Sequence, residues 1–262
     1  MRVQTPRGTF EVRTHGESGQ PLLLLHPLAL SGEIWRPVAE WFAARGRRVL
    51  AMDARGHGES DWDGAPFTVE DMADDVAAVV EALDTGPVDL LGMSMGGSTA
   101  VAVATGHPER IGRLVLADAT SCYGPDRVEV WEERARTAEQ KPRTELIDFQ
   151  LSRWFSERFR ESDPEACRRV VDVFLAADSA AHAAACRALG SFDQSDRLGE
   201  VRAPTLVLVG DEDYATPPAM AEVLAEGIPG ARLQVLAATR HLSLVENQDA
   251  WQWVEEHLGG TA

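Results

Sequence analysis

The chain has few cysteines, a single lysine and no long apolar run. Among its 262 residues there are 3 cysteines, Cys122, Cys167 and Cys186. Their odd number and wide spacing suggest neither a disulfide framework nor a zinc site. The N-terminal residues form no apolar signal core, and no apolar stretch is long enough to span a bilayer. We therefore expect a cytoplasmic enzyme with reduced, structural thiols.

Positive charge is also scarce. Lysine and arginine total 25 against 42 acidic residues, which gives a formal net charge of −17. Such a charge repels both nucleic acid and anionic membrane surfaces, so we expect neither as a partner. The acidic residues are spread along the chain, as on a solvated surface, and do not form an acidic tail. The sequence leaves open whether copies of the chain form a homo-oligomer.

Apolar stretches with strand-like character alternate with helical patterns through most of the chain. This alternation predicts an α/β fold in which helices cover both faces of a mostly parallel sheet. The expected strands cover residues 9–14, 22–26, 48–52, 88–91, 113–118, 205–209 and 232–236. The expected helices cover residues 35–44, 69–84, 95–105, 217–225 and 249–257. A chain of 262 residues can form one large domain of this class.

One segment departs from this alternation. Between residues 121 and 196 the strand pattern stops, and helical segments with several large aromatic residues take its place. We interpret residues 121–196 as a helical cap insertion over the sheet, and residues 1–120 and 197–262 as the core. We expect the aromatic side chains of the insertion to lie partly in the core and partly around a substrate pocket.

The most informative motif is Gly92-Met93-Ser94-Met95-Gly96, which lies between an apolar strand and a helix of small residues. A serine on such a sharp turn adopts a strained backbone conformation, and the glycines avoid clashes that a Cβ would make with neighbouring elements. The turn exposes the hydroxyl at a helix N-terminus, where unpaired N–H groups can stabilise negative charge. The motif therefore predicts a nucleophile elbow with Ser94 as the nucleophile.

A serine nucleophile needs a base, and the base needs an orienting carboxylate. In this architecture the acid follows the serine along the chain, and the histidine follows the acid. His241 comes after the strand expected at 232–236 and is the candidate base. Three carboxylates compete for the role of the acid, namely Asp213, Asp211 and Asp118. We favour Asp213 because it has the usual Gly-x-x-Asp spacing and leads into a helix start, and we assign Asp211 to stabilising the turn.

The chain has 7 histidines, and His241 is the strongest candidate base among them. His107 precedes a proline at the end of a helix. We expect His15, His182 and His257 in turns or on helix surfaces, exposed to solvent.

An oxyanion hole needs two backbone N–H donors. Met95, directly after the predicted nucleophile, is expected to supply one of them. The other should come from the loop after the strand at 22–26, where Pro27 has no N–H and Leu28 is the candidate donor. We expect His26 to order this loop rather than to act in acid–base chemistry.

A glycine-rich loop spans residues 53–60 and combines charged residues with two glycines. It lacks the Gly-Lys-Ser/Thr ending of a phosphate-binding loop. We interpret it as a structural loop in which Asp53 and Arg55 brace the edge of the active site.

With Ser94, Asp213 and His241 in this order, the chain resembles the α/β-hydrolase superfamily over nearly its full length. Within the superfamily it is most similar to the 3-oxoadipate enol-lactonases. That similarity rests on residues 92–97, the segment Ser152-Arg153-Trp154-Phe155, and residues 201–206, 213–218 and 241–246.

The resemblance implies a mechanism on a small carboxylic ester or lactone. Ser94 would attack the carbonyl carbon, and His241 would take its proton and later activate water. Asp213 would stabilise the imidazolium, and the N–H groups of Leu28 and Met95 would bind the oxyanion. The resemblance implies no metal and no organic cofactor.

The same resemblance suggests contacts to the substrate. Trp154 and Arg153 lie in the matching Arg-Trp-Phe stretch of the insertion and are predicted to line the pocket. An anionic enol-lactone would need a cationic partner, for which Arg134, Arg153 and Arg187 are candidates.

Other functions on this scaffold stay open. The triad pattern is equally compatible with a carboxylesterase, a carbon–carbon bond hydrolase or a tailoring hydrolase of a biosynthetic pathway. A non-catalytic small-molecule binder and cofactor-free oxygen chemistry or perhydrolysis are further alternatives.

Overall fold

An eight-stranded sheet forms the centre of the computed structural model, which describes residues 1–259. Its strand order is β1-β2-β4-β3-β5-β6-β7-β8. The strands are β1 (Arg2–Thr5), β2 (Gly8–His15), β3 (Pro21–Leu25), β4 (Arg48–Met52), β5 (Val88–Met93), β6 (Ile111–Ala117), β7 (Thr205–Gly210) and β8 (Arg232–Leu236). β2 pairs antiparallel with β1 and β4, and all other pairs are parallel. The mostly parallel sheet is therefore confirmed, and the short edge strand β1 is an addition to it.

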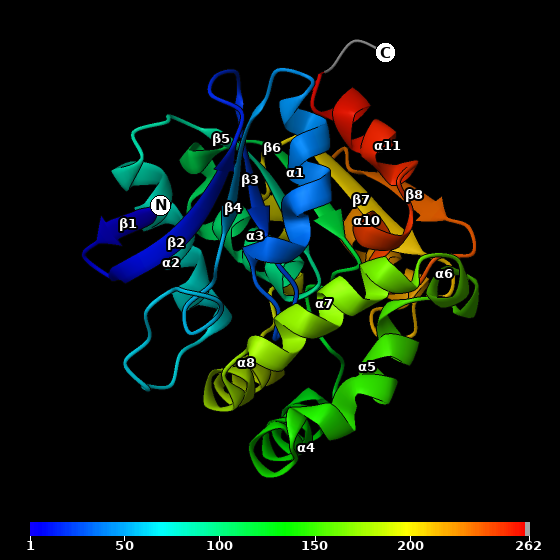
Figure 1. Cartoon of the computed structure of the whole chain (residues 1–262). Coiled ribbons are helices and arrows are strands. Elements are labelled where there is room, and N and C mark those ends of the chain that lie inside the picture. The colour runs from blue at the N-terminus through cyan, green and yellow to red at the C-terminus, as the bar shows by residue number, and fades with distance from the viewer. Residues whose placement is uncertain (260–262) are drawn as a thin grey trace.

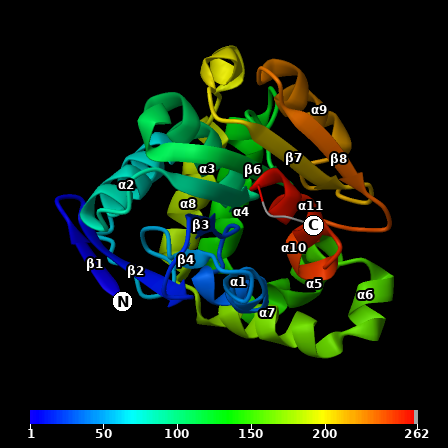
Figure 2. The same cartoon turned by 90° about the horizontal axis from the view of Figure 1, so that it is seen from above.

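Helices cover both faces of the sheet, as expected. The core helices are α1 (Arg36–Ala43), α2 (Val69–Ala82), α3 (Met95–Gly106), α9 (Pro218–Gly227), α10 (Ser243–Glu246) and α11 (Ala250–His257), with 3-10 helices η1 (Gly32–Trp35), η2 (Pro108–Arg110) and η4 (Ser195–Glu200). Figure 2 shows α2, α3 and α9 on one face and α1 and α11 on the other. Across residues 1–259, none of the helices combines the length and apolar character that a membrane crossing requires.

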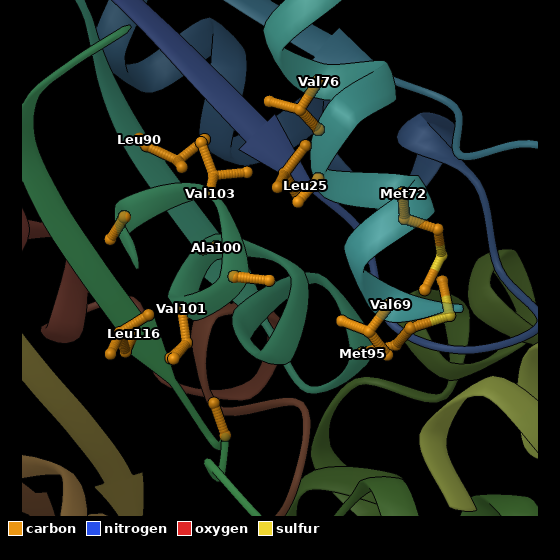
Figure 3. Close-up of a cluster of buried hydrophobic side chains, with 14 of the residues drawn as sticks. Leu25, Val69, Met72, Val76, Leu90, Met95, Ala100, Val101, Val103 and Leu116 are labelled. Atoms are coloured by element: carbon orange, nitrogen blue, oxygen red, sulfur yellow. The ribbon is translucent and has the colours of Figure 1, made fainter. Parts of the chain in front are cut away.

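Helix α2 illustrates how the sequence pattern positions a core element. Thr68 caps the N-terminus of α2 in a capping box. Its hydrogen bonds pair backbone N–H groups that have no partner within the first turn of a helix. Apolar residues at three- and four-residue steps, including Met72 and Val76, are buried against the sheet. Figure 3 shows Met72 beside Met95, so this packing reaches the first turn of α3.

The segment 121–196, called the helical insert below, lies between β6 and β7. It contains α4 (Arg127–Gln140), η3 (Arg143–Leu146), α5 (Ile147–Trp154), α6 (Glu157–Ser162), α7 (Pro164–Ala176) and α8 (Ser179–Ser191). A bridge between Cys122 and Asp193 joins its two ends. Helices α4 and α8 pack side by side, and a Cβ on Gly190 of α8 would lie 2.8 Å from the Cβ of Trp131 on α4. Figure 1 shows α4, α5, α7 and α8 grouped beyond one end of the sheet.

Candidate active site

Ser94 lies on the turn between β5 and α3 in a strained conformation, with φ 56° and ψ −119°. Its N–H donates to the carbonyl of Ala117 at 2.9 Å, which fixes the turn against β6. A Cβ on Gly92 would lie 2.1 Å from the carbonyl oxygen of Gly96, and one on Gly96 would lie 2.2 Å from that of Leu25. Both glycines are therefore required by close backbone contacts, as the motif predicts.

His241 connects Ser94 with Asp213. The Nε2 atom of His241 is 2.8 Å from Ser94 Oγ, and its Nδ1 atom is 2.8 Å from Asp213 Oδ2. An ionised carboxylate only accepts hydrogen bonds, so the Nδ1–H donates to Asp213 and Nε2 is free to accept from the serine hydroxyl. All three side chains are buried. The structure thus brings the three predicted residues into one hydrogen-bonded chain.

Asp213 is held as an anion by several donors. The backbone N–H groups of Ala215 and Thr216 lie 2.7 and 3.1 Å from its Oδ1, and the Thr216 hydroxyl lies 2.8 Å from its Oδ2. Burial by itself would raise the pKa of Asp213, but His241 and the Thr216 donors outweigh burial and lower it below its usual value. A charged carboxylate at this place can stabilise an imidazolium on His241.

The two competing carboxylates have other partners. Asp211 accepts from the N–H of Thr239 at 3.3 Å, so its hydrogen bond joins its loop to the loop after β8 instead of closing its own turn. Asp118 is fully buried and accepts from the N–H of Gly210 at 3.2 Å and from that of Ser243 at 3.0 Å. Burial raises the pKa of Asp118 well above its usual value. Asp118 therefore joins the end of β7 to the start of α10, next to the loops that carry Asp213 and His241.

The loops after β3 and β4 are also tied together. The Nε2 atom of His26 accepts from the N–H of Ala54 at 3.0 Å, so its Nδ1 carries the proton and donates to the carbonyl of Pro27 at 2.7 Å. The Asp53 carboxylate accepts from the N–H of Gly32 at 2.6 Å. His26 thus orders its loop, and Asp53 braces this edge of the sheet.

The two predicted oxyanion donors lie near Ser94. Leu28 lines the same cavity as Ser94, and Met95 begins helix α3 directly after it. Within residues 1–259, no backbone hydrogen bond uses the N–H of Leu28 or of Met95. Both donors are therefore available to a ligand.

A cavity of about 80 Å³ opens above Ser94, between the sheet edge and the helical insert. Its walls are Pro27, Leu28, Ser94 and His241 from the core, and Trp131, Arg134, Thr137, Ala138, Leu146, Phe149, Gln150, Arg153, Trp154, His182 and Cys186 from the insert. Trp154 and Arg153 thus line the cavity, as the resemblance to the enol-lactonases predicts. Within residues 1–259, no group of three His, Cys, Asp or Glu side chains is arranged to hold a metal ion.

The cationic candidates differ in their surroundings. Arg134 is half-buried at the cavity, with its guanidinium carbon 4.6 Å from the ring centre of Trp131, and it has no ion pair among residues 1–259. Burial lowers its pKa. Arg187 instead binds Glu132 at 2.8 Å and Glu139 at 2.7 Å on an exposed surface. Arg187 is therefore already neutralised and does not line the cavity, whereas Arg134 does.

Two histidines contradict the expectation of solvent exposure. His257 is buried, with its Nε2 3.1 Å from the carbonyl oxygens of Leu114 and of Pro204. His182 is buried on α8 and lines the cavity. The one sequence signal for His182 is its setting among alanines at 180–185, because such small side chains allow close helix packing.

The alpha/beta hydrolase fold family matches residues 20–248 of the chain. The chain belongs to this family. It is similar to 3-oxoadipate enol-lactonase 2 of Acinetobacter baylyi, with 28% identity over 93% of this chain and 90% of the relative. These findings confirm the fold and the resemblance predicted from the sequence.

Solved structures of hydrolases have the same fold as this chain. The enol-lactonase from Burkholderia xenovorans LB400 superposes with a TM-score of 0.93 at 31% identity, over 98% of this chain and 99% of that one. A thermophilic esterase from Thermogutta terrifontis has a TM-score of 0.90 at 30% identity, over 98% and 97% of the two chains. The similarities support the prediction that the chain is a hydrolase.

Proposed function

We propose that this hydrolase opens a small lactone, with compounds like 3-oxoadipate enol-lactone as the leading substrate class. The observation that carries the proposal is the hydrogen-bonded chain of Ser94, His241 and Asp213 at the base of a small cavity. The cavity volume of about 80 Å³ is far below the roughly 300–1,000 Å³ of typical ligand pockets, which favours a compact acyl group. The similarity to two enol-lactonases supports the same class.

The first half of the reaction forms an acyl-enzyme. His241 Nε2 accepts the proton of the Ser94 hydroxyl while Oγ attacks the carbonyl carbon. The carbonyl oxygen becomes an oxyanion that the N–H groups of Leu28 and Met95 bind. When this intermediate collapses, the ring oxygen leaves with the proton from His241, and it stays tethered to the acyl group because the substrate is cyclic.

The second half releases the acid. His241 removes a proton from water, the resulting hydroxide attacks the acyl carbon, and the proton then returns to Ser94 Oγ as the ester bond breaks. Asp213 stabilises the imidazolium that forms in each half. The net change is the addition of one water across the lactone bond.

The walls of the cavity suit an anionic substrate with an apolar ring. Arg134 and Arg153 are cations at the cavity, and neither has an ion pair among residues 1–259. Trp131 and Trp154 offer flat apolar surfaces. A lactone that carries a carboxylate would bind to both kinds of wall.

A substrate panel tests the proposal. Purified protein is assayed with carboxylated enol-lactones, aryl esters and vinylogous 1,5-diketones, and we expect the highest kcat/KM on the lactones. Activity on aryl esters without lactone activity would establish a carboxylesterase instead, a reading that the similarity to a thermophilic esterase supports. Activity on the diketones alone would establish a carbon–carbon bond hydrolase.

A fluorophosphonate probe tests whether the chain is catalytic at all. We expect the wild type to be labelled and the Ser94→Ala variant not to be. An unlabelled wild type that still binds lactones would identify a non-catalytic small-molecule binder.

A further inference from the structure

We propose that His182 determines specificity for substrates that carry a carboxylate, because Arg143 fixes its Nε2–H as a donor that binds the carboxylate together with Arg134. The inference rests on the proposed function, since it concerns the substrate of the same cavity. It adds a residue outside the triad and outside the stretches that resemble the enol-lactonases.

His182 has a defined place in the cavity wall. It lies on α8, one turn before Cys186, and both residues line the cavity that contains Ser94. Its ring packs edge-on against Phe174, with ring centres 6.3 Å apart. His182 is only 5% exposed, so the cavity is the space that its free ring atoms can reach.

Arg143 determines which nitrogen of His182 carries the proton. An Nη1 atom of Arg143 lies 3.3 Å from His182 Nδ1. A guanidinium has only donors, so Nδ1 must be the unprotonated acceptor and the proton of the neutral ring must be on Nε2. Within residues 1–259, no hydrogen bond uses His182 Nε2. The Nε2–H is therefore a donor without a protein acceptor.

The position of Arg143 is itself fixed. Its Nε donates to the carbonyl of Phe174 at 2.6 Å, and its guanidinium carbon lies 4.0 Å from the centre of the Phe174 ring. Burial lowers the pKa of Arg143 to about 10, which still leaves it charged at neutral pH. The hydrogen bond to His182 thus comes from an oriented, permanent cation.

The charges around His182 keep it neutral. Burial is the main cause that lowers its pKa, to about 3, and Arg143 on η3, His57 on the loop after β4 and Arg134 on α4 lower it further. His57 is neutral as well, because burial lowers its pKa to about 3. The cavity wall therefore combines the cation of Arg134 with the neutral donor of His182, and the fixed cation of Arg143 is hydrogen-bonded to the other nitrogen of that ring.

A carboxylate fits this arrangement better than an uncharged group does. It accepts two hydrogen bonds in one plane, one from the Arg134 guanidinium and one from His182 Nε2–H, and its charge is stabilised by both arginines. An ester or amide in the same place offers no charge to Arg134. The inferred substrate is thus a lactone or ester with a carboxylate on a short side chain.

Paired substrates test this inference. We compare kcat/KM for a carboxymethyl-substituted lactone with that for its methyl ester, in the wild type and in His182→Leu. We expect about a tenfold loss for the acid and less than a twofold change for the methyl ester. Arg187→Met, on the outer surface of the same helix, is the matched control and should change neither value. An equal loss on both substrates would overturn the inference.

A conservative variant of His182 distinguishes the loss of the N–H donor from a general disturbance of the cavity wall. His182→Gln retains an N–H donor, and we expect it to recover part of the preference for the acid. A variant that folds like the wild type and recovers none of the preference would also count against the inference.

The role of Arg143 has its own test. In Arg143→Met the ring of His182 loses the donor that fixes its tautomer, while burial still keeps the ring neutral. Some of the rings then carry the proton on Nδ1 and offer no donor at Nε2. We expect KM for the acid to rise at least about twofold in this variant, because the donor tautomer is less populated and the charge of Arg143 is gone, and KM for the methyl ester to stay constant. An unchanged KM for the acid would overturn the part assigned to Arg143.

Binding to a catalytically dead protein separates the inference from the proposed function. Butanoate is titrated into Ser94→Ala and into Ser94→Ala with His182→Leu, and we expect about tenfold weaker binding to the double variant. If this difference appears while no lactone is hydrolysed by the wild type, only the proposed function fails. If lactones are hydrolysed but butanoate binds equally to both variants, only the inference fails.

Discussion

The buried polar groups of the loops at the sheet edge have hydrogen-bond partners within the protein, whereas two polar groups of the helical insert do not. On the loops, Asp213 and Asp118 each accept several hydrogen bonds from donors within the protein. On the insert, Arg134 has no ion pair and His182 Nε2 has no hydrogen bond among residues 1–259. Hydrogen bonds within the protein hold reacting groups in the geometry that the reaction needs. Groups that recognise a substrate must instead keep a donor or a charge without a protein partner, so that the substrate can bind to it.

The largest expected effect concerns the nucleophile. Ser94→Ala removes the attacking oxygen, and we expect kcat on any ester or lactone substrate to fall by about 10⁴–10⁶. The variant should still bind butanoate, because the recognition groups lie on the insert. Steady-state kinetics and calorimetry measure the two quantities. Residual activity of more than about one per cent would contradict the role of Ser94.

The next largest effect concerns the acid. Asp213→Asn leaves His241 without a carboxylate at Nδ1 and favours the wrong tautomer, so we expect kcat to fall by about 10⁴. Asp211→Asn is the matched control on the same loop, and its kcat should change by less than about threefold. Equal losses in the two variants, measured under saturating substrate, would show that the loop rather than Asp213 is what matters.

An intermediate effect is expected on the insert. Arg134→Met keeps much of the side-chain volume but removes the charge, and we expect kcat/KM for a carboxylated lactone to fall by about 10- to 100-fold. The fluorophosphonate labelling rate should stay nearly constant, because the triad is unchanged. If labelling falls in parallel with lactone hydrolysis, Arg134 supports the fold of the site instead of binding the substrate.

Asp118 should matter for stability more than for chemistry. Asp118→Ala leaves the buried N–H groups of Gly210 and Ser243 unpaired, and we expect the free energy of unfolding to fall by about 2–4 kcal/mol. We expect a smaller loss for Asp118→Asn, which keeps one acceptor. Denaturant titration at neutral pH measures both values. An unchanged midpoint for Asp118→Ala would show that the two loops do not depend on this residue.

The smallest expected effect is a pH dependence of stability. The pKa of Asp213 is lower in the folded protein than its ordinary value of 3.8. The stability that its ionised form contributes is therefore complete above about pH 5 and is lost as the pH falls through the folded pKa. Asp213→Asn should lose less stability than the wild type between pH 5 and pH 3, as measured by thermal melts. A steeper loss in the variant would contradict the lowered pKa.

The sequence predicted the core, and it picked out the three residues that the structure joins by hydrogen bonds, Ser94, His241 and Asp213, for local reasons. Strands and helices of the core have strong periodicity, and Gly92 and Gly96 are needed because of close contacts that recur wherever a serine lies on such a turn. Asp213 and His241 follow strands whose carboxyl ends must meet at one edge of a parallel sheet. The four-residue edge strand β1 and the four-residue helix α10 were too short to give a periodic signal.

The insert was harder to predict because its function depends on helix packing. The preference among Arg134, Arg153 and Arg187 could not be read from the sequence, since an arginine on a helix faces a cavity or the solvent according to how the helices are rotated. The structure shows that Arg187 binds Glu132 on α4 instead of facing the cavity. The prediction for His182 was wrong for the same reason.

Sequence alone determined the fold family, and it predicted Ser94 as the nucleophile and the chain order of the proposed triad, because these follow from short motifs and from the direction of parallel strands. Only the tertiary structure decided which cations lack partners and which nitrogen of His182 carries a proton. Those properties depend on side chains from separate helices, and a hydrogen bond between η3 and α8 has no signature in either segment. The chemistry that we propose for this site therefore depends on local motifs, and the proposed specificity depends on how the helices of the insert pack.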